Sequence, residues 1–370
     1  MSELQINNVL TNNYIVLCGG TGGVGKTTTA AALGIIGAGL GRKTLVLTID
    51  PARRLAAALG LDSLDAHPQQ IDEVPGLYAM MLDPGSTFDE LIQRHASDRK
   101  TAEDLLSHPY YQQISAGVAG SREFMAMEKI HELAESHEYE LLIVDTPPAQ
   151  YALDFIDAPK RLIEILDGSG FSLLLRANNF ANKLSFGLVN KSQQQFARLF
   201  EQLTGHTLML DINSFFNAFS DVTDGFKTRA ETLQALLRSE KSTFLLVMTP
   251  ASDATLVAKT YLHRLHNEGI HVSGAVFNQT HHVTSIASEL DLATSAVNAG
   301  LSGTLYERAS ACYKQALVRS QRDNRIMETW QKDMQLATRE IPRLEGNVSK
   351  LEDLQFFARA LSVNLSSWPS

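Results

Sequence analysis

The chain has little cysteine, no excess of positive charge and no long apolar run. Its 370 residues include only two cysteines, Cys18 and Cys312, so a single chain can build neither a disulfide framework nor a four-cysteine zinc site. Lysine and arginine number 32 against 41 aspartate and glutamate, and the formal net charge is −9. A chain without a basic field is disfavoured as a binder of nucleic-acid backbones, so we expect no nucleic-acid partner.

We expect neither a signal peptide nor a membrane-spanning segment. Residues 1–20 lack the basic start, the apolar stretch and the small-residue cleavage site of a signal peptide. No stretch approaches the roughly 18 consecutive apolar residues of a membrane-spanning helix. Together with the low cysteine content, these absences predict a cytoplasmic protein without stable membrane insertion.

Short apolar segments rich in β-branched residues recur along the chain and alternate with segments of helical period. This alternation predicts a doubly wound, mostly parallel α/β sheet. Several segments are hydrophobic throughout, as central strands covered by helices on both faces must be. The expected strands are residues 14–18, 44–49, 77–82, 141–144, 244–248 and 272–277.

A glycine-rich stretch, Gly-Thr-Gly-Gly-Val-Gly-Lys-Thr at residues 20–27, follows the first expected strand and precedes a helix-forming run. It satisfies the pattern G-x-x-x-x-G-K-[ST], whose glycines leave backbone N–H groups free to wrap phosphate oxygens. In this pattern Lys26 places a charge between the β- and γ-phosphates, and the hydroxyl of Thr27 is offered to Mg²⁺. A plain glycine-rich turn would need neither residue, so we predict the phosphate loop of a P-loop NTPase.

Two further strands end in a carboxylate. Asp50 follows the apolar residues 45–49, and Asp145 follows residues 141–144. Because a ligand of an open α/β sheet binds beyond the carboxyl ends of its strands, both acids should converge on the loop that carries Lys26. Asp145 has the position of a Mg²⁺-site acid, and Asp50 is a candidate to orient the attacking water. The alternative, that each aspartate caps the next helix, stays open, above all for Asp50.

The alternation of strands and helices is interrupted after Asp145, where about a hundred residues read as helices broken by loops. We therefore expect an α-helical insertion at residues 151–240. The P-loop nucleotide-binding domain would consist of residues 1–150 and 241–370, and the insertion would belong to the same compact unit.

The last amphipathic helix is expected at residues 351–361, after a short run at residues 335–341. A helix of this kind could anchor a protein to a membrane surface. Because Glu352 and Asp353 stand at its start, we expect a helix docked on the domain instead.

The three motifs together resemble those of the arsenite-pump and tail-anchored-protein-targeting ATPases, within the dimeric P-loop class. That family's loop reads G-K-G-G-V-G-K-T-T, its switch I D-P-A and its switch II D-T-A-P. The corresponding stretches here are residues 20–28, 50–52 and 145–148. Residues 243–250, a helix and residues 274–279 look like the family's strand-helix-strand unit, which ends in an Asn that reads adenine. Residues 341–344 are similar to the loop that closes over the base.

The resemblance implies a Mg²⁺-dependent ATPase that forms a dimer, with itself or with a paralogue, and couples its nucleotide state to a hydrophobic client or a protein partner. Lys26 and Asp50 would be catalytic, and Thr27 and Asp145 would hold Mg²⁺. The residues implied to bind ATP are Gly22, Gly23, Val24, Gly25, Lys26, Thr27, Thr28, Asn278 and Pro342.

The chain departs from the family pattern at Thr21, where members carry a signature lysine that reaches the partner's phosphates. Threonine supplies no charge, and a cation in that place can be worth several orders of magnitude in rate. We therefore expect slow hydrolysis unless Arg53 or Arg54 supplies the charge; the alternative, that both are solvated arginines at the start of a helix, stays open. Switch II departs too, because Ala-Gln-Tyr at residues 149–151 replaces the family's Thr-Gly-His.

Cysteine and histidine mark another departure. Zinc-clamped members carry a C-x-x-C pair and arsenite-activated members several cysteines, whereas we expect Cys18 and Cys312 to be small buried hydrophobes. His281 and His282 lack a third ligand at suitable spacing, which favours a solvated loop over a metal site. Neither zinc clamping nor arsenite sensing is expected.

Two functions remain as hypotheses. The first is an ATP-driven targeting factor whose insertion binds an apolar helix. The second is a weakly hydrolysing assembly or regulatory subunit, paired with a paralogue that keeps the signature lysine. The apolar residues of 171–226 suit a client groove, but only one of the nine methionines, Met209, lies there, which favours packing within the protein.

Overall fold

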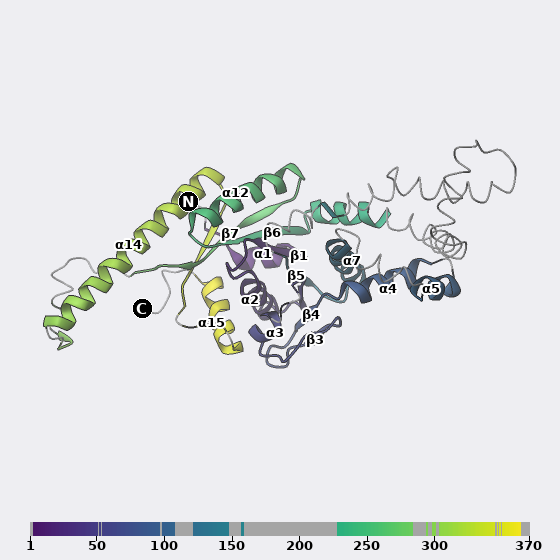
Figure 1. Ribbon diagram of the computed structural model, residues 1–370, viewed down its shortest axis with the longest axis horizontal. Helices are drawn as coiled ribbons and strands as arrows, with labels where there is room; N and C mark the ends of the chain where they lie inside the picture. Colours follow the sequence, from purple (N-terminus) through teal and green to yellow (C-terminus); the bar gives the residue numbers. More distant parts are fainter. Residues whose placement is uncertain are drawn as a thin grey trace, which may run out of the picture. The chain divides into compact units, whose positions relative to one another are not determined.

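A computed structural model describes most of the chain. The described residues are 3–50, 52, 54–96, 98–107, 121–147, 157–158, 228–283, 294, 298–300, 303–344, 346, 348 and 350–363. The chain divides into two compact units (Figure 1). The first comprises residues 1–81, 137–152 and 237–370, and the second residues 82–136 and 153–236.

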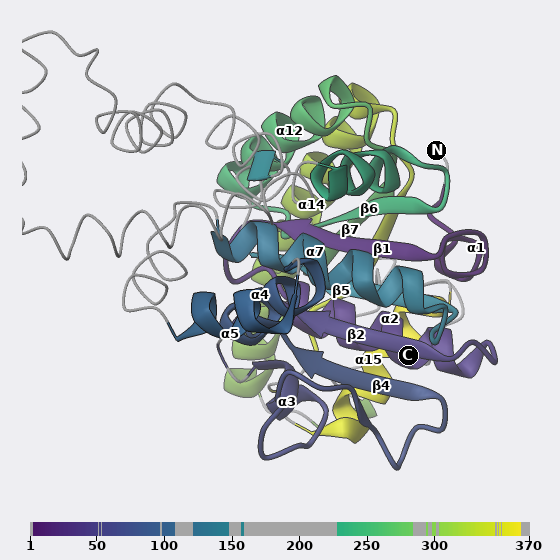
Figure 2. The same ribbon diagram turned by 90° about the vertical axis from the view of Figure 1, so that its right-hand side faces the viewer.

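The first unit is built on an eight-stranded sheet in the order β3-β4-β2-β5-β1-β6-β7-β8. The strands are β1 (Ile15–Gly20), β2 (Thr44–Thr48), β3 (Gln69–Gln70), β4 (Leu77–Met81), β5 (Leu141–Asp145), β6 (Ser242–Met248), β7 (Val272–Thr280) and β8 (Thr338–Pro342). All neighbours are parallel except β3 and β4. Figure 2 shows β4, β2 and β1 running in one direction. The predicted doubly wound, mostly parallel sheet is confirmed, and the short run at residues 335–341 supplies most of its edge strand β8.

One face of the sheet is covered by helix α2 (Lys26–Gly39), which packs against β1, β2, β4 and β5. Alternate strand residues such as Val16, Val46 and Ile143 belong to its apolar core, as the two-residue repeat of a strand requires. Helices α1 (Ile6–Asn12), α3 (Arg54–Ala58) and α15 (Leu351–Ser362) pack against α2 on the same face. The terminal helix α15 buries Leu354, Phe357, Ala358 and Leu361 there, so the expected docked helix is confirmed.

The opposite face carries α12 (Ser252–Asn267) and α14 (Gly303–Met334). The ring of Tyr261 in α12 meets Phe244 of β6 edge to face at 6.2 Å. The ring of Trp330 in α14 meets Phe277 of β7 in the same way at 5.6 Å. These two aromatic pairs fix the helices to the half of the sheet formed by β6 and β7.

The second unit contains α4 (Pro84–His95), α5 (Arg99–Leu106), α7 (Ser121–Ser136) and the helical residues 228–236. Ion pairs join α4 to α7, with Lys129 Nζ 2.7 Å from Glu90 Oε2 and Arg94 3.2 Å from Glu132. The prediction assigned residues 82–136 to the nucleotide-binding domain, whereas they group with the second unit because α4 packs on both α5 and α7. The expected insertion, 151–240, and the apolar residues of 171–226 lie mostly outside the described residues, so their role stays a prediction. No helix in the described part of the chain is both long and apolar enough to cross a lipid bilayer.

Candidate nucleotide site

The phosphate loop lies between the end of β1 at Gly20 and the start of α2 at Lys26. Gly23 and Gly25 have φ angles of 77° and 93°, in the left-handed region that favours glycine. Gly25 is also the residue that precedes α2, so the loop amides and the positive end of the helix dipole face the same space. The strand, loop and helix are therefore arranged as the motif predicted, and Gly22, Val24 and Thr28 lie on the loop or the first helical turn.

Lys26 is buried within the loop, with 8% of its surface exposed. Its Nζ donates a hydrogen bond to the carbonyl oxygen of Thr21 at 2.9 Å. Burial lowers the pKa of Lys26, and the nearby carboxylates of Asp145 and Asp50 partly offset that effect. The ammonium group is thus held across the loop, at the position where the phosphates of a nucleotide would enter.

Asp145 ends β5 and lies against the first turn of α2. Its Oδ2 accepts hydrogen bonds from the hydroxyls of Thr27 at 2.8 Å and Thr48 at 3.0 Å. Its Oδ1 is buried and has no hydrogen-bond partner among the described residues. Burial raises the pKa of Asp145 to about 6, against the lowering effect of the two hydroxyls and of Lys26. The structure therefore brings the two predicted Mg²⁺-site residues, Thr27 and Asp145, into direct contact.

Asp50 follows β2 and is 24% exposed at its side chain. Its Oδ1 accepts from the backbone N–H of Ala52 at 3.0 Å, and its Oδ2 lies 3.4 Å from the guanidinium of Arg54. The first bond closes a local turn before α3 (Arg54–Ala58) and does not cap that helix, and the role of Asp50 in orienting water stays a prediction. Arg54, 66% exposed, is paired with Asp50 within the chain, whereas Arg53 lies outside the described residues.

Switch II begins beside β1. The hydroxyl of Thr146 donates to the carbonyl oxygen of Cys18 at 2.7 Å, which ties the residue after Asp145 to the neighbouring strand. The departure from the family pattern at residues 149–151 lies outside the described residues.

Asn278 and Pro342 were expected to contact adenine. Asn278 lies in β7, is 4% exposed, and donates from Nδ2 to the carbonyl oxygen of Val24 at 2.9 Å. Pro342 ends β8 and stands in register with Thr280. The structure thus places Asn278 against the phosphate loop itself, a contact that the sequence did not predict.

The cysteines and histidines differ in part from the predictions. Cys18 is fully buried in β1, as expected, and burial raises the pKa of its thiol. Cys312 is exposed, so that prediction was wrong; it lies on the part of α14 before Ser320, where no residue is buried. His281 is not simply solvated, because its Nδ1 lies 2.7 Å from Oδ2 of the fully buried Asp323. Across the described residues, no group of three or more His, Cys, Asp or Glu is placed to share a metal ion.

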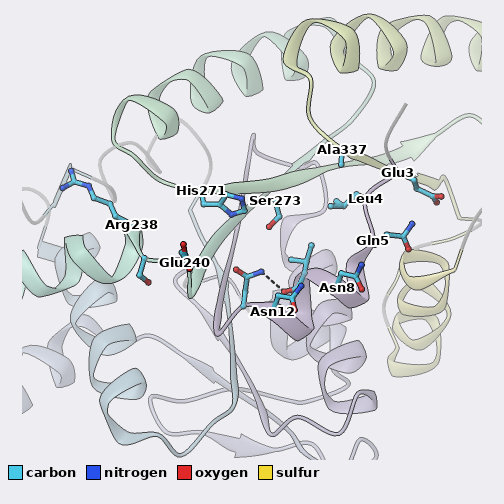
Figure 3. Close-up of a pocket in the computed structure, with 13 residues that line it drawn as sticks. Glu3, Leu4, Gln5, Asn8, Asn12, Arg238, Glu240, His271, Ser273 and Ala337 are labelled. Carbon is cyan, nitrogen blue, oxygen red and sulfur yellow. Dashed lines mark hydrogen bonds between the residues drawn. The ribbon is translucent and has the colours of Figure 1, made fainter.

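A cavity of about 610 Å³ opens at the opposite end of the sheet (Figure 3). Its walls come from α1, from the residues that flank α1, and from residues at or just before the amino ends of β6, β7 and β8. Figure 3 shows Asn8 and Asn12 of α1 on one side and His271 on the other. Because ligands of such sheets bind at the carboxyl ends, this cavity is separate from the phosphate loop.

The sequence was compared with those of known protein families. A sequence profile of the anion-transporting ATPases matches residues 13–362. The chain belongs to this family. The family resemblance expected from the three motifs is thereby confirmed, and the match covers the loop, both switch aspartates and the strands that carry them.

Three curated relatives of this anion-transporting ATPase family member are similar over long segments. The protein named ATPase GET3 from Malassezia globosa is 30% identical over 199 residues, 52% of this chain and 58% of that protein. ATPase ASNA1 homolog 1 from Paramecium tetraurelia is 29% identical over 212 residues, 54% of this chain and 61% of that protein. The ATPase ASNA1 homolog from Entamoeba dispar is 24% identical over 283 residues, which are 74% of this chain and 79% of that protein. In the first two comparisons the chain spans about three fifths of the relative's length.

Proposed function

We propose that this family member is an ATPase that binds Mg·ATP at residues 20–28 and uses the bound state as a switch. The observation that carries the proposal is Asp145, buried at the end of β5 with one oxygen bonded to Thr27 and Thr48 and the other without a partner. A buried carboxylate with an unpaired oxygen is unfavourable unless a cation joins it. The three relatives, each named as an ATPase, support the same activity.

The donor set fits Mg²⁺, which prefers carboxylate and hydroxyl oxygens and few protein ligands. Thr27 and Asp145 would hold the ion, and when bound it would neutralise charge on the β- and γ-phosphates. Thr48 would keep the Asp145 carboxylate oriented through its hydrogen bond of 3.0 Å.

Phosphate binding and orientation of the attacking water would be performed by residues of this chain. The amides of Gly22 to Thr28 and the start of α2 would hold phosphate oxygens. Lys26 would exchange the carbonyl of Thr21 for a phosphate oxygen, a stronger acceptor for an ammonium group. Asp50 would orient the attacking water once its Oδ2 is free of Arg54.

We also make proposals for the rate of hydrolysis and for the partner that this chain binds. Thr21 presents no charge where the family has a lysine, so we infer slow turnover within a dimer formed with itself or with a paralogue. A hydrophobic client bound by the helical insertion is the first cellular role. The second candidate, a weakly hydrolysing assembly or regulatory subunit, is favoured by Thr21 and by the engagement of Arg54 with Asp50 inside the chain.

Phosphate release by the purified wild type tests the proposal. Asp50→Asn should lower kcat at least about 100-fold, the scale of a lost proton acceptor or water-orienting group, and leave ATP affinity within a few-fold. Asp62→Asn, which changes an exposed aspartate elsewhere in the unit, is the matched control and should leave kcat unchanged. Failure of the wild type to bind ATP would contradict the proposal, and binding with a rate equal to Asp50→Asn would favour the regulatory candidate.

Oligomeric state is measured by light scattering with and without ATP. A dimer of this chain in ATP supports self-association, and a dimer only after a paralogue is added supports the heteromeric form. A monomer under all of these conditions would contradict the dimeric switch.

A further inference from the structure

A local irregularity in β7 directs Asn278 out of the regular ladder. The pairing of β7 with β8 shifts register between Phe277 and Thr280. Within this bulge Gln279 has a φ of +59°, uncommon for a residue with a side chain. The side-chain Oδ1 of Asn278 accepts the N–H of Gln279 at 2.9 Å and so supports the turn. Bulges often re-aim a side chain at a functional position, and here the side chain meets the phosphate loop.

The contact between Asn278 and the loop is close and buried. Nδ2 of Asn278 donates to the carbonyl oxygen of Val24 at 2.9 Å, and Asn278 and Val24 are 4% and 3% exposed. A Cβ built on Gly25 would lie 2.2 Å from the same Nδ2. Asn278 therefore occupies the space beside Gly25 that any other residue there would need.

The geometry of the peptide unit gives this hydrogen bond a consequence for phosphate binding. The carbonyl of Val24 and the N–H of Gly25 belong to one trans peptide plane and point in opposite directions. When Asn278 holds the carbonyl on its side, the N–H of Gly25 is turned away from Asn278, so this hydrogen bond fixes the direction in which that N–H can donate. Without Asn278, the buried carbonyl would lose its partner and the peptide could rotate.

We propose that Asn278 is a positioning residue that holds the phosphate loop in its binding shape before any nucleotide arrives. This inference rests on the proposed nucleotide site, since a loop of another function would not need that shape. It is compatible with the adenine contact expected from the family resemblance. The amide nitrogen carries two hydrogens, of which Val24 takes one, so the second stays available to a base.

The two roles of Asn278 differ in what they predict for a ligand without a base. Inorganic tripolyphosphate with Mg²⁺ fills the phosphate loop but offers nothing to an adenine reader. If Asn278 positions the loop, Asn278→Ala weakens the binding of tripolyphosphate about tenfold, the scale of one buried hydrogen bond, and weakens the binding of ATP at least as much. If Asn278 only reads the base, the variant weakens ATP alone.

The test combines calorimetric titration with hydrogen exchange of the nucleotide-free protein. Asn12→Ala, which changes an exposed asparagine at the far end of the sheet, is the matched control and should leave both affinities unchanged. Asn278→Ser, which keeps an acceptor for Gln279 but is too short to reach Val24, replaces the alanine variant if that variant does not fold. In either variant the amides of residues 20–30 should exchange at least tenfold faster than in the wild type.

Loss of ATP affinity with unchanged tripolyphosphate affinity and unchanged exchange would overturn the inference. Failure of the wild type to bind either ligand would contradict the proposed function instead. Exchange of the nucleotide-free loop would still decide the role of Asn278 in that case, because it needs no ligand: faster exchange in the variant supports positioning, and equal exchange refutes it.

Discussion

Asp145→Asn should stabilise the nucleotide-free protein. Asp145 is 1% exposed, and burial is the main cause that raises its pKa from 3.8 to about 6. A folded-state pKa above the unfolded-state value means that folding favours the protonated acid, so stability falls as pH rises from about 4 to 6 and stays lower above. At 1.36 kcal/mol per pKa unit, the deficit is about 1.5 kcal/mol at pH 5 and about 3 kcal/mol at pH 7.5. Asparagine keeps an oxygen for Thr27 and Thr48 but buries no charge.

Urea denaturation of the wild type and Asp145→Asn at these two pH values measures the difference. The variant should be more stable at both, by about twice as much at pH 7.5 as at pH 5. In the wild type, Mg·ATP should close the gap because binding favours the ionised carboxylate, and in the variant Mg²⁺ should add little. Asp62→Asn, an exposed site, should show no pH-dependent difference. A variant no more stable than the wild type at pH 7.5, or a gap independent of pH, would refute the reasoning.

Three further predictions concern the surroundings of the site. Gly25→Ala should destabilise the protein by at least about 1 kcal/mol and abolish ATP binding, because φ at Gly25 is 93° and the new Cβ would lie 2.2 Å from Asn278. The control is Gly39→Ala, whose new Cβ would have nothing within 4 Å. Measured by thermal unfolding and calorimetry, this control should be near neutral. Asp323→Asn should lower the free energy of unfolding, measured by urea denaturation, by about 2 kcal/mol, because its fully buried carboxylate bonds both His281 and Arg322. In the control, Asp333→Asn, the ion pair with Lys259 is exposed, so the same free energy should change by less than about 1 kcal/mol. Arg54→Ala should leave kcat within about twofold because its pair with Asp50 is exposed and within the chain; a tenfold fall in phosphate release would instead make Arg54 the substitute for the absent lysine.

The strands and the phosphate loop could be predicted from the sequence because their determinants are local. Apolar runs such as residues 141–144 are wholly buried, so their composition alone marks them as central strands. The glycines of the loop are required by its backbone angles, and Lys26 and Thr27 follow at fixed spacing. Asp145 was predicted for the same reason, as the residue that ends such a strand.

The contacts that hold the site together depend on pairings that the sequence does not reveal. Thr48 reaches Asp145 because β2 and β5 are neighbours and place the two residues in register. Asn278 reaches Val24 across 254 positions of sequence through a bulge in β7. The link of His281 to Asp323 likewise needs the packing of α14 on the end of β7. Each was missed because strand order, register and helix packing are properties of the assembled fold.

The nucleotide site is tested by equilibrium binding of ATP to the wild type and to Lys26→Ala, in the presence and absence of Mg²⁺. Lys26 is 8% exposed and spans the loop, whereas Lys43 is 36% exposed at its side chain and pairs with Glu138, so Lys43→Ala is the matched control. We expect Mg²⁺-dependent binding by the wild type and Lys43→Ala, and a loss of about 100-fold in affinity for Lys26→Ala, the scale of a charge-assisted phosphate contact with a buried ammonium. Equal affinity of Lys26→Ala and the wild type, or binding that does not respond to Mg²⁺, would contradict the proposed site.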